Sequence, residues 1–266
     1  SFTRPKGIAS LSWQQSESLK LVTKVERRVS QLDFFDFISW VNLETDNGQG
    51  GNPGIVPNQS WRLNLEAQTD LKDWGASTLR AIFVRLEDVV DQVPIGTGSG
   101  PGNLESGTLS VIETETSLKL SRAGFEGAEL TVTGGYFDTG VDDPVTGERR
   151  AINGHPIYEY DVELRQDVPG ADWAWGVVIE GFKQEPEYQI SQIALEGNEP
   201  AFPMAYLEHK NIGGMTGTVA LGNLFNQRDK FWRETYAPDR NAARVRSEEY
   251  ARGFGPIFTM ELKGTF

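Results

Sequence analysis

The sequence predicts an all-β fold: an antiparallel, up-and-down transmembrane β-barrel with long extracellular loops. Two observations lead to this prediction. Apolar and polar residues alternate in segments of about ten residues, whereas helical periodicity is scarce. The connections between these segments are short and long in turn, which is the arrangement of an outer-membrane barrel. We expect about 11 such strands.

The clearest strands are Trp61–Gln68, Tyr158–Arg165 and Met215–Leu221, where every second residue is apolar or small. No Lys or Arg falls on the apolar side of these three, as a surface that faces lipid requires. The remaining candidates are less regular. They are Lys6–Gln14, Leu19–Arg28, Leu79–Asp88, Leu109–Leu120, Ala128–Thr139, Trp173–Gln184, Pro203–Lys210 and the closing segment Gly255–Phe266.

The connections separate this barrel from a soluble β-sandwich, in which strands also alternate. Four short ones, KDWGAS, RAGFEGA, PGAD and NIGGM, contain the Gly, Pro and Asp residues of tight turns. Loops as long as those between them are uncommon in a compact soluble domain. The predicted long loops are Val29–Asn58, Val89–Glu105, the regions near 140–156 and 185–201, and Phe225–Phe254.

Composition excludes several classes of function. The chain has 38 acidic and 25 basic residues, a formal charge of −13, and so lacks the basic excess that nucleic acid binding needs. It has no cysteine, which excludes disulfides and thiolate metal sites. No run of 18 apolar residues is present, so a transmembrane helix is not expected. The chain begins at Ser1 without a signal-peptide pattern, which we interpret as a mature form or a fragment.

Residues capable of catalysis or metal binding are few. His155 and His209 are the only histidines, so a His-rich metal cluster is not possible. Carboxylates recur in groups that could form acid–base pairs, but residues two apart on a strand share a face, which favours a charged, water-filled lumen. We predict no enzyme, no catalytic residue, no metal and no cofactor. The carboxylate groups are Glu113 and Glu115, Asp142 and Asp143, and Glu159, Asp161 and Glu163.

Two internal motifs flank predicted strands. GNPGIVPNQSWRLNLE, from Gly51 to Glu66, places Asn52, Pro53 and Pro57 before a strand, where the prolines stiffen the approach. VALGNLFNQ, from Val219 to Gln227, ends a strand at Asn223 and Leu224. There an Asn side chain can satisfy local backbone groups as the chain turns outward.

These motifs and the closing strand resemble TonB-dependent outer-membrane receptors. The first is similar to the Asn-Pro-x-Leu-x-Pro-Glu signature of that family, with Ile55 and Asn58 in place of Leu and Glu. The second is similar to the Asn-Leu-Phe-Asp segment of its penultimate strand, with Asn226 in place of Asp. The third resembles the family's outer-membrane sorting signal, carried here by Phe258, Met260, Leu262 and Phe266.

The resemblance implies that residues 1–266 are a partial barrel domain, the C-terminal half of a 22-stranded barrel, without the N-terminal plug domain. It further implies TonB-energised uptake of a scarce nutrient such as a ferric siderophore, cobalamin or an oligosaccharide. The implied partners are the TonB complex through the missing plug, the barrel assembly machinery through the C-terminal strand, and outer-membrane lipid. The implied location is the outer membrane of a Gram-negative bacterium.

Long loops are the expected ligand-binding surface, because they combine aromatic and charged side chains. The sequence does not indicate which ligand binds. A small passive porin is the first alternative function, followed by an outer-membrane enzyme and a soluble β-sandwich binding protein. The candidate ligand-binding residues are Phe34, Phe35 and Trp40 in one loop and Arg228, Trp232, Arg233 and Tyr236 in another.

Overall fold

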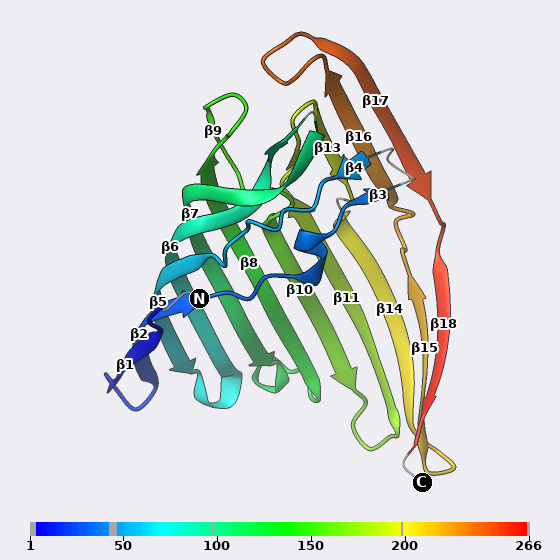
Figure 1. Cartoon of the computed structure of the whole chain (residues 1–266). Coiled ribbons are helices and arrows are strands. Elements are labelled where there is room, and N and C mark those ends of the chain that lie inside the picture. Colours follow the sequence, from blue (N-terminus) through cyan, green and yellow to red (C-terminus); the bar gives the residue numbers. More distant parts are fainter. Residues whose placement is uncertain (1–3, 43–46, 97, 198, 265–266) are drawn as a thin grey trace.

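A computed structural model describes residues 4–42, 47–96, 98–197 and 199–264. Eleven strands form one sheet path in which each strand pairs antiparallel with the next strand of the path in chain order (Figure 1). The fold is therefore an up-and-down meander. The path consists of β1 (Gly7–Gln14), β2 (Leu19–Val29), β5 (Gln59–Asp70), β6 (Gly75–Ile95), β7 (Gly98–Lys119), β8 (Ala128–Asp142), β10 (Pro156–Asp167), β11 (Trp173–Gln184), β14 (Glu199–Ile212), β15 (Met215–Gly222) and β18 (Ile257–Lys263).

Each predicted strand corresponds to one strand of this path, so the all-β fold and the number of strands are confirmed. The four short connections are turns at one end of the sheet, at the bottom of Figure 1. The long connections lie at the opposite end, which we call the loop end. Phe266, the last residue of the predicted closing strand, lies outside the described residues.

One predicted loop is wrong. Residues Val89–Glu105 largely continue the β6–β7 hairpin, whose turn lies between Ile95 and Gly98. Val89 and Leu104 pair directly across this hairpin and are buried against Val141 of β8. The Gly and Pro residues of this stretch suggested a loop, but apolar packing against β8 holds it in a ladder.

The predicted loop Phe225–Phe254 also contains strands that the sequence did not indicate. A second, four-stranded sheet at the loop end consists of β12 (Glu187–Tyr188), β13 (Gln192–Glu196), β16 (Arg228–Tyr236) and β17 (Arg244–Gly253). Figure 1 shows the β16–β17 hairpin projecting beyond the main sheet. Shorter elements are η1 (Phe34–Phe37), β3 (Trp40–Asn42), β4 (Asn47–Gln49), η2 (Lys72–Trp74), η3 (Ser121–Ala123) and β9 (Arg149–Arg150).

One face of the main sheet is apolar and uncovered. Residues paired across neighbouring strands share a face, and this register carries the apolar face from β1 to β18. Ile112, for example, lies opposite Ala81 and Tyr136, and 60% of its surface is exposed. A soluble domain rarely exposes such a patch. Its large exposed members are Leu11, Trp13, Val25, Trp61, Leu65, Leu79, Phe83, Ile112, Tyr136, Trp175, Leu207, Leu221, Phe258, Met260 and Leu262.

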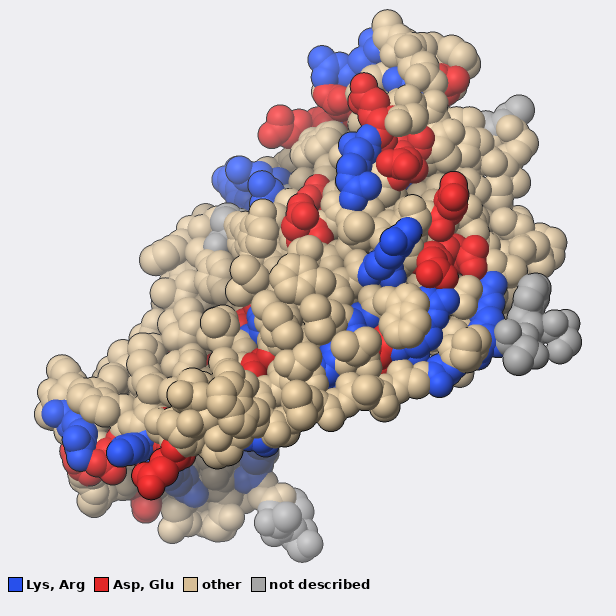
Figure 2. All heavy atoms as spheres, turned by 90° about the vertical axis from the view of Figure 1, so that its left-hand side faces the viewer, with Lys and Arg blue, Asp and Glu red and all other residues tan. Residues whose placement is uncertain are grey.

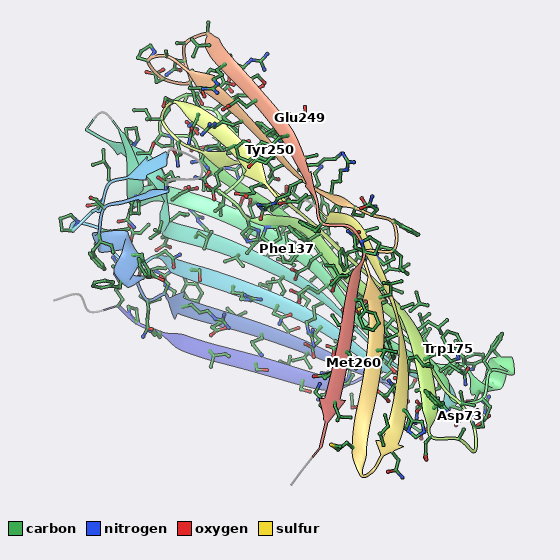
Figure 3. The ribbon with its side chains drawn as sticks, turned by 90° about the vertical axis from the view of Figure 1, so that its right-hand side faces the viewer. Asp73, Phe137, Trp175, Glu249, Tyr250 and Met260 are labelled. Carbon is green, nitrogen blue, oxygen red and sulfur yellow. The ribbon has the colours of Figure 1, made fainter. Side chains whose placement is uncertain are left out.

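Figure 2 shows this molecule from the β1 side, where a broad area without charged side chains separates charges at the upper end from charges at the lower left. Figure 3 places Glu249 and Tyr250 at the loop end and Asp73 at the turn end. Among the described residues, no helix is long and apolar enough to cross a membrane.

The opposite face of the sheet is charged, and ion pairs on it link strands that lie one or two places apart. Arg80 of β6 donates to Glu66 of β5 across 2.8 Å, and Arg165 of β10 donates to Glu208 of β14 across 2.6 Å. Toward the loop end this face becomes apolar and buried. There the side chains of Ile82, Val84 and Val111 pack with Leu86, Leu109 and Phe137.

Candidate functional site

The first motif fastens the long β2–β5 loop to the β6–β7 hairpin. Asn52 donates its side-chain amide to the carbonyl of Pro101 at 3.0 Å and accepts from the backbone of Gly54 at 2.9 Å. Asn103 of β7 then pairs with Val56 in both directions, donating to its carbonyl at 2.8 Å and accepting from its N–H at 2.9 Å. The amide of Asn103 thus replaces a strand partner for the segment that enters β5.

The second motif closes the base of the β15–β18 loop, and Asn223 has the expected local role. Its side chain is fully buried, and its backbone is left-handed at φ 53°. The side-chain amide donates to the carbonyls of Gln227 and Gly255 at 3.1 and 3.0 Å, and its oxygen accepts from the Gln227 N–H at 2.6 Å. One side chain therefore joins the two ends of a loop that carries the β16–β17 hairpin.

A buried network of charges, which the sequence did not reveal, joins the extended β6–β7 hairpin to three connections at the loop end. Arg150 donates to Asp143 at 2.6 Å and to Asp91 at 3.0 Å, and Arg240 donates to Asp143 at 2.6 Å. Both arginine side chains are 6% exposed and both carboxylates 1%. We call Asp91, Asp143, Arg150 and Arg240 the loop clamp.

Tyr188 extends the loop clamp to the β11–β14 connection. The guanidinium carbons of Arg150 and Arg240 lie 5.0 and 5.4 Å from the centre of its ring, within the range of cation–π attraction. Its backbone N–H donates to Asn153 at 2.9 Å, and Asn153 in turn donates to its carbonyl at 3.0 Å. The extended β6–β7 hairpin and the β8–β10, β11–β14 and β15–β18 connections therefore share one set of contacts.

Asp143 is the centre of the loop clamp and stays ionised. Burial on its own would raise the pKa of this carboxyl. Hydrogen bonds from the backbone N–H groups of Thr146 and Val145 and from Arg240 and Arg150 outweigh burial and lower the pKa to about 2. The clamp therefore keeps its central charge at all physiological pH values.

A sequence signal for part of this arrangement exists. Asp143 is the second residue of the segment DDPVTGE, and its side chain accepts from Val145 and Thr146 as in an Asx turn. Its ion pair with Arg240 spans 97 positions and depends on how the loops fold against one another, which one sequence does not show. The neighbouring Asp142, grouped with Asp143 in the sequence, is instead 81% exposed.

The candidate ligand-binding residues fall in two separate places. Phe34 and Phe35 are exposed in η1, with ring centres 6.1 Å apart. Trp40 begins β3, which pairs with β4. The other four, Arg228, Trp232, Arg233 and Tyr236, all lie on β16, where Arg228 and Trp232 share one face and Arg233 lies on the other.

Two of the β16 side chains already have protein partners. Arg233 donates to Glu248 of β17 at 2.7 Å, and the Tyr236 hydroxyl donates to Glu234 at 2.7 Å. The hydrogen bond with Glu234 raises the pKa of Tyr236, as does burial. Tyr236 also lines a pocket of about 270 Å³ together with Asp143, Arg150 and Arg240, so this hairpin borders the loop clamp.

The charged face carries the predicted lumen carboxylates. Glu113, Glu115, Glu159 and Asp161 line a hollow of about 340 Å³ together with Arg80. His155 packs against Phe137 and His209 against Trp173, with ring centres 5.6 and 4.5 Å apart. Within the described part of the chain, no group of three or more His, Asp or Glu side chains is placed to hold a metal.

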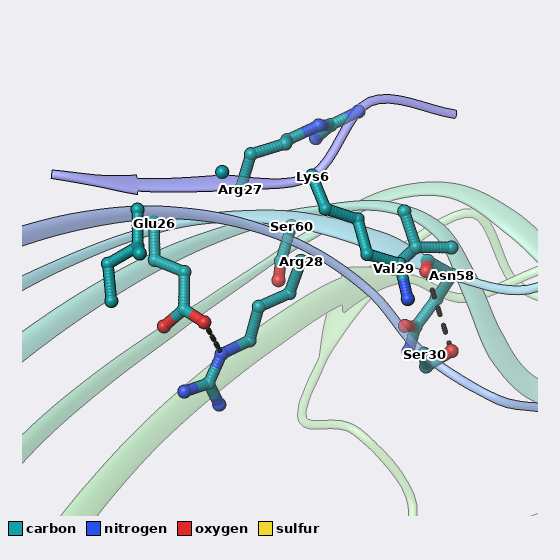
Figure 4. A pocket seen from close by; sticks show the side chains of 10 residues that line it. Lys6, Glu26, Arg27, Arg28, Val29, Ser30, Asn58 and Ser60 are labelled. Carbon is teal, nitrogen blue, oxygen red and sulfur yellow. Dashed lines mark hydrogen bonds and ion pairs between the residues drawn. The ribbon is translucent and has the colours of Figure 1, made fainter. Parts of the chain in front are cut away.

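A further hollow lies along the β1 edge of the sheet path (Figure 4). It measures about 660 Å³ and is lined by residues from β1, β2 and the start of β5. Arg28 donates to Glu26 across 2.8 Å at its wall, and Ser30 donates to the carbonyl of Asn58. In a closed barrel the next strand covers such an edge, so this hollow is not an independent ligand site.

Comparison with known proteins identifies the fold. No family model and no curated protein matches the sequence. Among solved structures, the chain is similar to the ferric enterobactin receptor PfeA of Pseudomonas aeruginosa (G324V mutant), with a TM-score of 0.63 and 14% identity over 97% of this chain and 39% of that chain. PfeA carrying Q482A, in complex with enterobactin, gives a TM-score of 0.62 and 14% identity over 95% and 39%.

The siderophore receptor PirA from Acinetobacter baumannii is similar as well, with a TM-score of 0.58 and 11% identity over 84% of this chain and 37% of that chain. The chain therefore spans less than half the length of the receptors that it matches. These likenesses show that it has the barrel fold of siderophore receptors, in the form of a partial barrel.

Proposed function

We propose that this chain, which has the fold of a partial siderophore-receptor barrel, belongs to a TonB-dependent receptor in the outer membrane of a Gram-negative bacterium. The observation that carries the proposal is the uncovered apolar face, which runs across the whole sheet path between short turns and long loops. Lipid is the environment that stabilises such a face.

In this proposal residues 1–266 are the C-terminal half of a 22-stranded barrel, and a plug domain outside this chain fills the lumen. The open edges at β1 and β18 support it, because unpaired strand edges are not stable in a bilayer. The plug would contact the TonB complex. The closing strand, with Phe258, Met260 and Leu262 on the apolar face, would direct assembly by the barrel assembly machinery.

The receptor would bind a small nutrient at its loops and release it inward after TonB moves the plug. Ferric siderophores, cobalamin and oligosaccharides are the candidate ligand classes. The β16 residues Arg228, Trp232, Arg233 and Tyr236, together with Phe34, Phe35 and Trp40, are the proposed ligand contacts. The loop clamp supports this role, since it holds three connections against the β6–β7 hairpin in one arrangement and so lowers the entropic cost of binding.

A passive porin is the second candidate, because the charged face also suits a water-filled pore. Uptake measurements separate the two. Cells that express the complete gene should accumulate a radiolabelled ligand only when TonB is functional, and Trp232→Ala should reduce binding. Influx that persists without TonB would refute the receptor and favour the porin. A protein found in the soluble cell fraction would refute both.

A further inference from the structure

We propose that the apolar face carries a site for one anionic membrane lipid, with its phosphate held by Arg85 and Arg149 and its acyl chain in the hollow beneath them. The inference deepens the proposed function in one respect, because it requires the apolar face to lie in a bilayer. It concerns the lipid around the barrel and is independent of the nutrient that the loops bind.

The hollow measures about 350 Å³ and lies over β2, β5, β6 and β7. Its apolar walls include Trp61, Leu63 and Phe83, whose side chains share the apolar face. Ser110 lies opposite Phe83 on the next strand, and its small side chain leaves the space open. An acyl chain that fills this hollow would bury the apolar surface of its walls, which stabilises the complex.

A cation without a partner stands at the loop end of this hollow. Arg85 is exposed on the apolar face and has no hydrogen bond or ion pair with any described residue. The nearby Arg27 differs, because it is paired with Glu87 at 2.8 Å and lies over the Trp61 ring. An unpaired guanidinium at the margin of a lipid-facing surface has its natural partner in a lipid phosphate.

A second arginine reaches the same point from the β8–β10 connection. Thr108 lies directly opposite Arg85 on β7, and Arg149 donates to the Thr108 hydroxyl at 2.6 Å. A Cβ atom placed on Gly140 would lie 2.3 Å from Arg149, so the guanidinium lies over a glycine backbone that leaves room for it. Thr108 is thus paired with Arg85 and bonded to Arg149, and two guanidinium groups on one side of a sheet can both donate to a phosphate.

The carboxylates of Asp142 and Asp138 do not occupy the guanidinium groups of Arg85 and Arg149. Asp142 approaches Arg149 only to 3.9 Å and is largely exposed, so solvent screens the pair. Asp138 lies opposite Ser110, two pairs nearer the turn end than Thr108, beside the acyl hollow rather than at the arginines. The site lies toward the loop end, with two arginines beside an apolar hollow, and so favours a lipid whose phosphate head group has a net negative charge.

Native mass spectrometry of the complete receptor in detergent tests the site. The probes are dioleoyl phosphatidic acid, dioleoyl phosphatidylcholine with the same acyl chains, and inorganic phosphate as a head group without a chain. We expect phosphatidic acid to bind at least about tenfold more tightly than either of the others. Arg85→Gln and Arg149→Gln should each lower the affinity for phosphatidic acid about tenfold.

Two further variants complete the test. Arg246→Gln, an exposed arginine of β17, is the matched control and should bind lipid as the parent does. Ser110→Phe keeps both arginines but fills the hollow, and should weaken phosphatidic acid binding. The proposal is overturned if the two lipids bind equally, if Arg85→Gln has no effect, or if inorganic phosphate binds as tightly as phosphatidic acid. The parent and each variant are also assayed for membrane insertion. Absence of the parent protein from membranes would refute the proposed function instead.

Discussion

Replacement of Asp143 by Asn tests whether the long loops open as one unit. The carboxylate accepts from Arg150 at 2.6 Å and from Arg240 at 2.8 and 2.6 Å, and all three side chains are buried. Asparagine keeps the shape but removes the charge, and its NH₂ group would face a guanidinium. Removing one partner of a buried ion pair costs about 3–5 kcal/mol.

The lowered pKa gives an independent lower limit for this cost. A carboxyl whose pKa falls from 3.8 to about 2 on folding stabilises the folded state by about 2 kcal/mol at neutral pH. This free energy includes only the preference of the folded state for the charged form of Asp143 over its protonated form. A loss of about 3 kcal/mol corresponds to an increase of more than 100-fold in the population of opened loops.

Hydrogen exchange with mass spectrometry at neutral pH measures this opening. In Asp143→Asn we expect faster exchange at Val145 and Thr146, which donate to the carboxylate, and also at Tyr188 and Ile190 in another connection. Asp142→Asn is the control, because its exposed neighbouring carboxylate should leave exchange unchanged. Faster exchange confined to Val145 and Thr146 would refute the idea that the clamp unites the loops.

Three further predictions concern the fold. Asn223→Ala leaves the backbone groups of Gln227 and Gly255 without their hydrogen-bond partner, so it should lower the free energy of unfolding by about 2–3 kcal/mol and accelerate proteolysis within the β15–β18 loop. The control Asn226→Gly should have neither effect. Ile112→Arg, on the apolar face, should destabilise the folded barrel in lipid by about 2–4 kcal/mol in urea unfolding, while Thr131→Arg on the charged face should change it little. The loop clamp should loosen as pH falls from about 4 to about 2, because the lowered pKa of Asp143 contributes stability that is lost when the carboxylate is protonated. Spin labels at positions Glu148 and Ala243 should then report a longer distance between the two labels. An unchanged distance at pH 2 would contradict the assignment.

Strand positions could be predicted from the sequence because each depends on a local pattern. Trp61, Leu63 and Leu65 alternate with Arg62 and Asn64, and the pleat of a strand turns that alternation into two faces. Turn positions followed from Gly and Pro in the same way. The β6–β7 extension was missed because its stability comes from contact with Val141, which the local composition of Val89–Glu105 does not report.

The candidate site was less predictable, since its contacts join residues far apart in the sequence. Asn223 could be assigned a role because its partners lie within its own loop, and Asn52 could be recognised by its motif. Nothing in the sequence around Arg150 or Arg240 indicates that either side chain is buried. Their importance depends on burial beside Asp143 and Tyr188, and burial of a loop residue is a property of the folded set of loops.

The distribution of charged residues explains how an acidic chain can present an apolar face. The net charge of −13 excluded nucleic acid but gave no position for the carboxylates. In the structure many of them lie on the charged face, as Glu113 and Glu159 do, or in the loops, as Asp143 does. The apolar face carries charged side chains toward the loop end, among them Arg27, Arg85, Glu87 and Asp138. Because charge is most costly at the middle of a bilayer and least at its surface, this placement follows from the depth of each residue in the membrane that we propose.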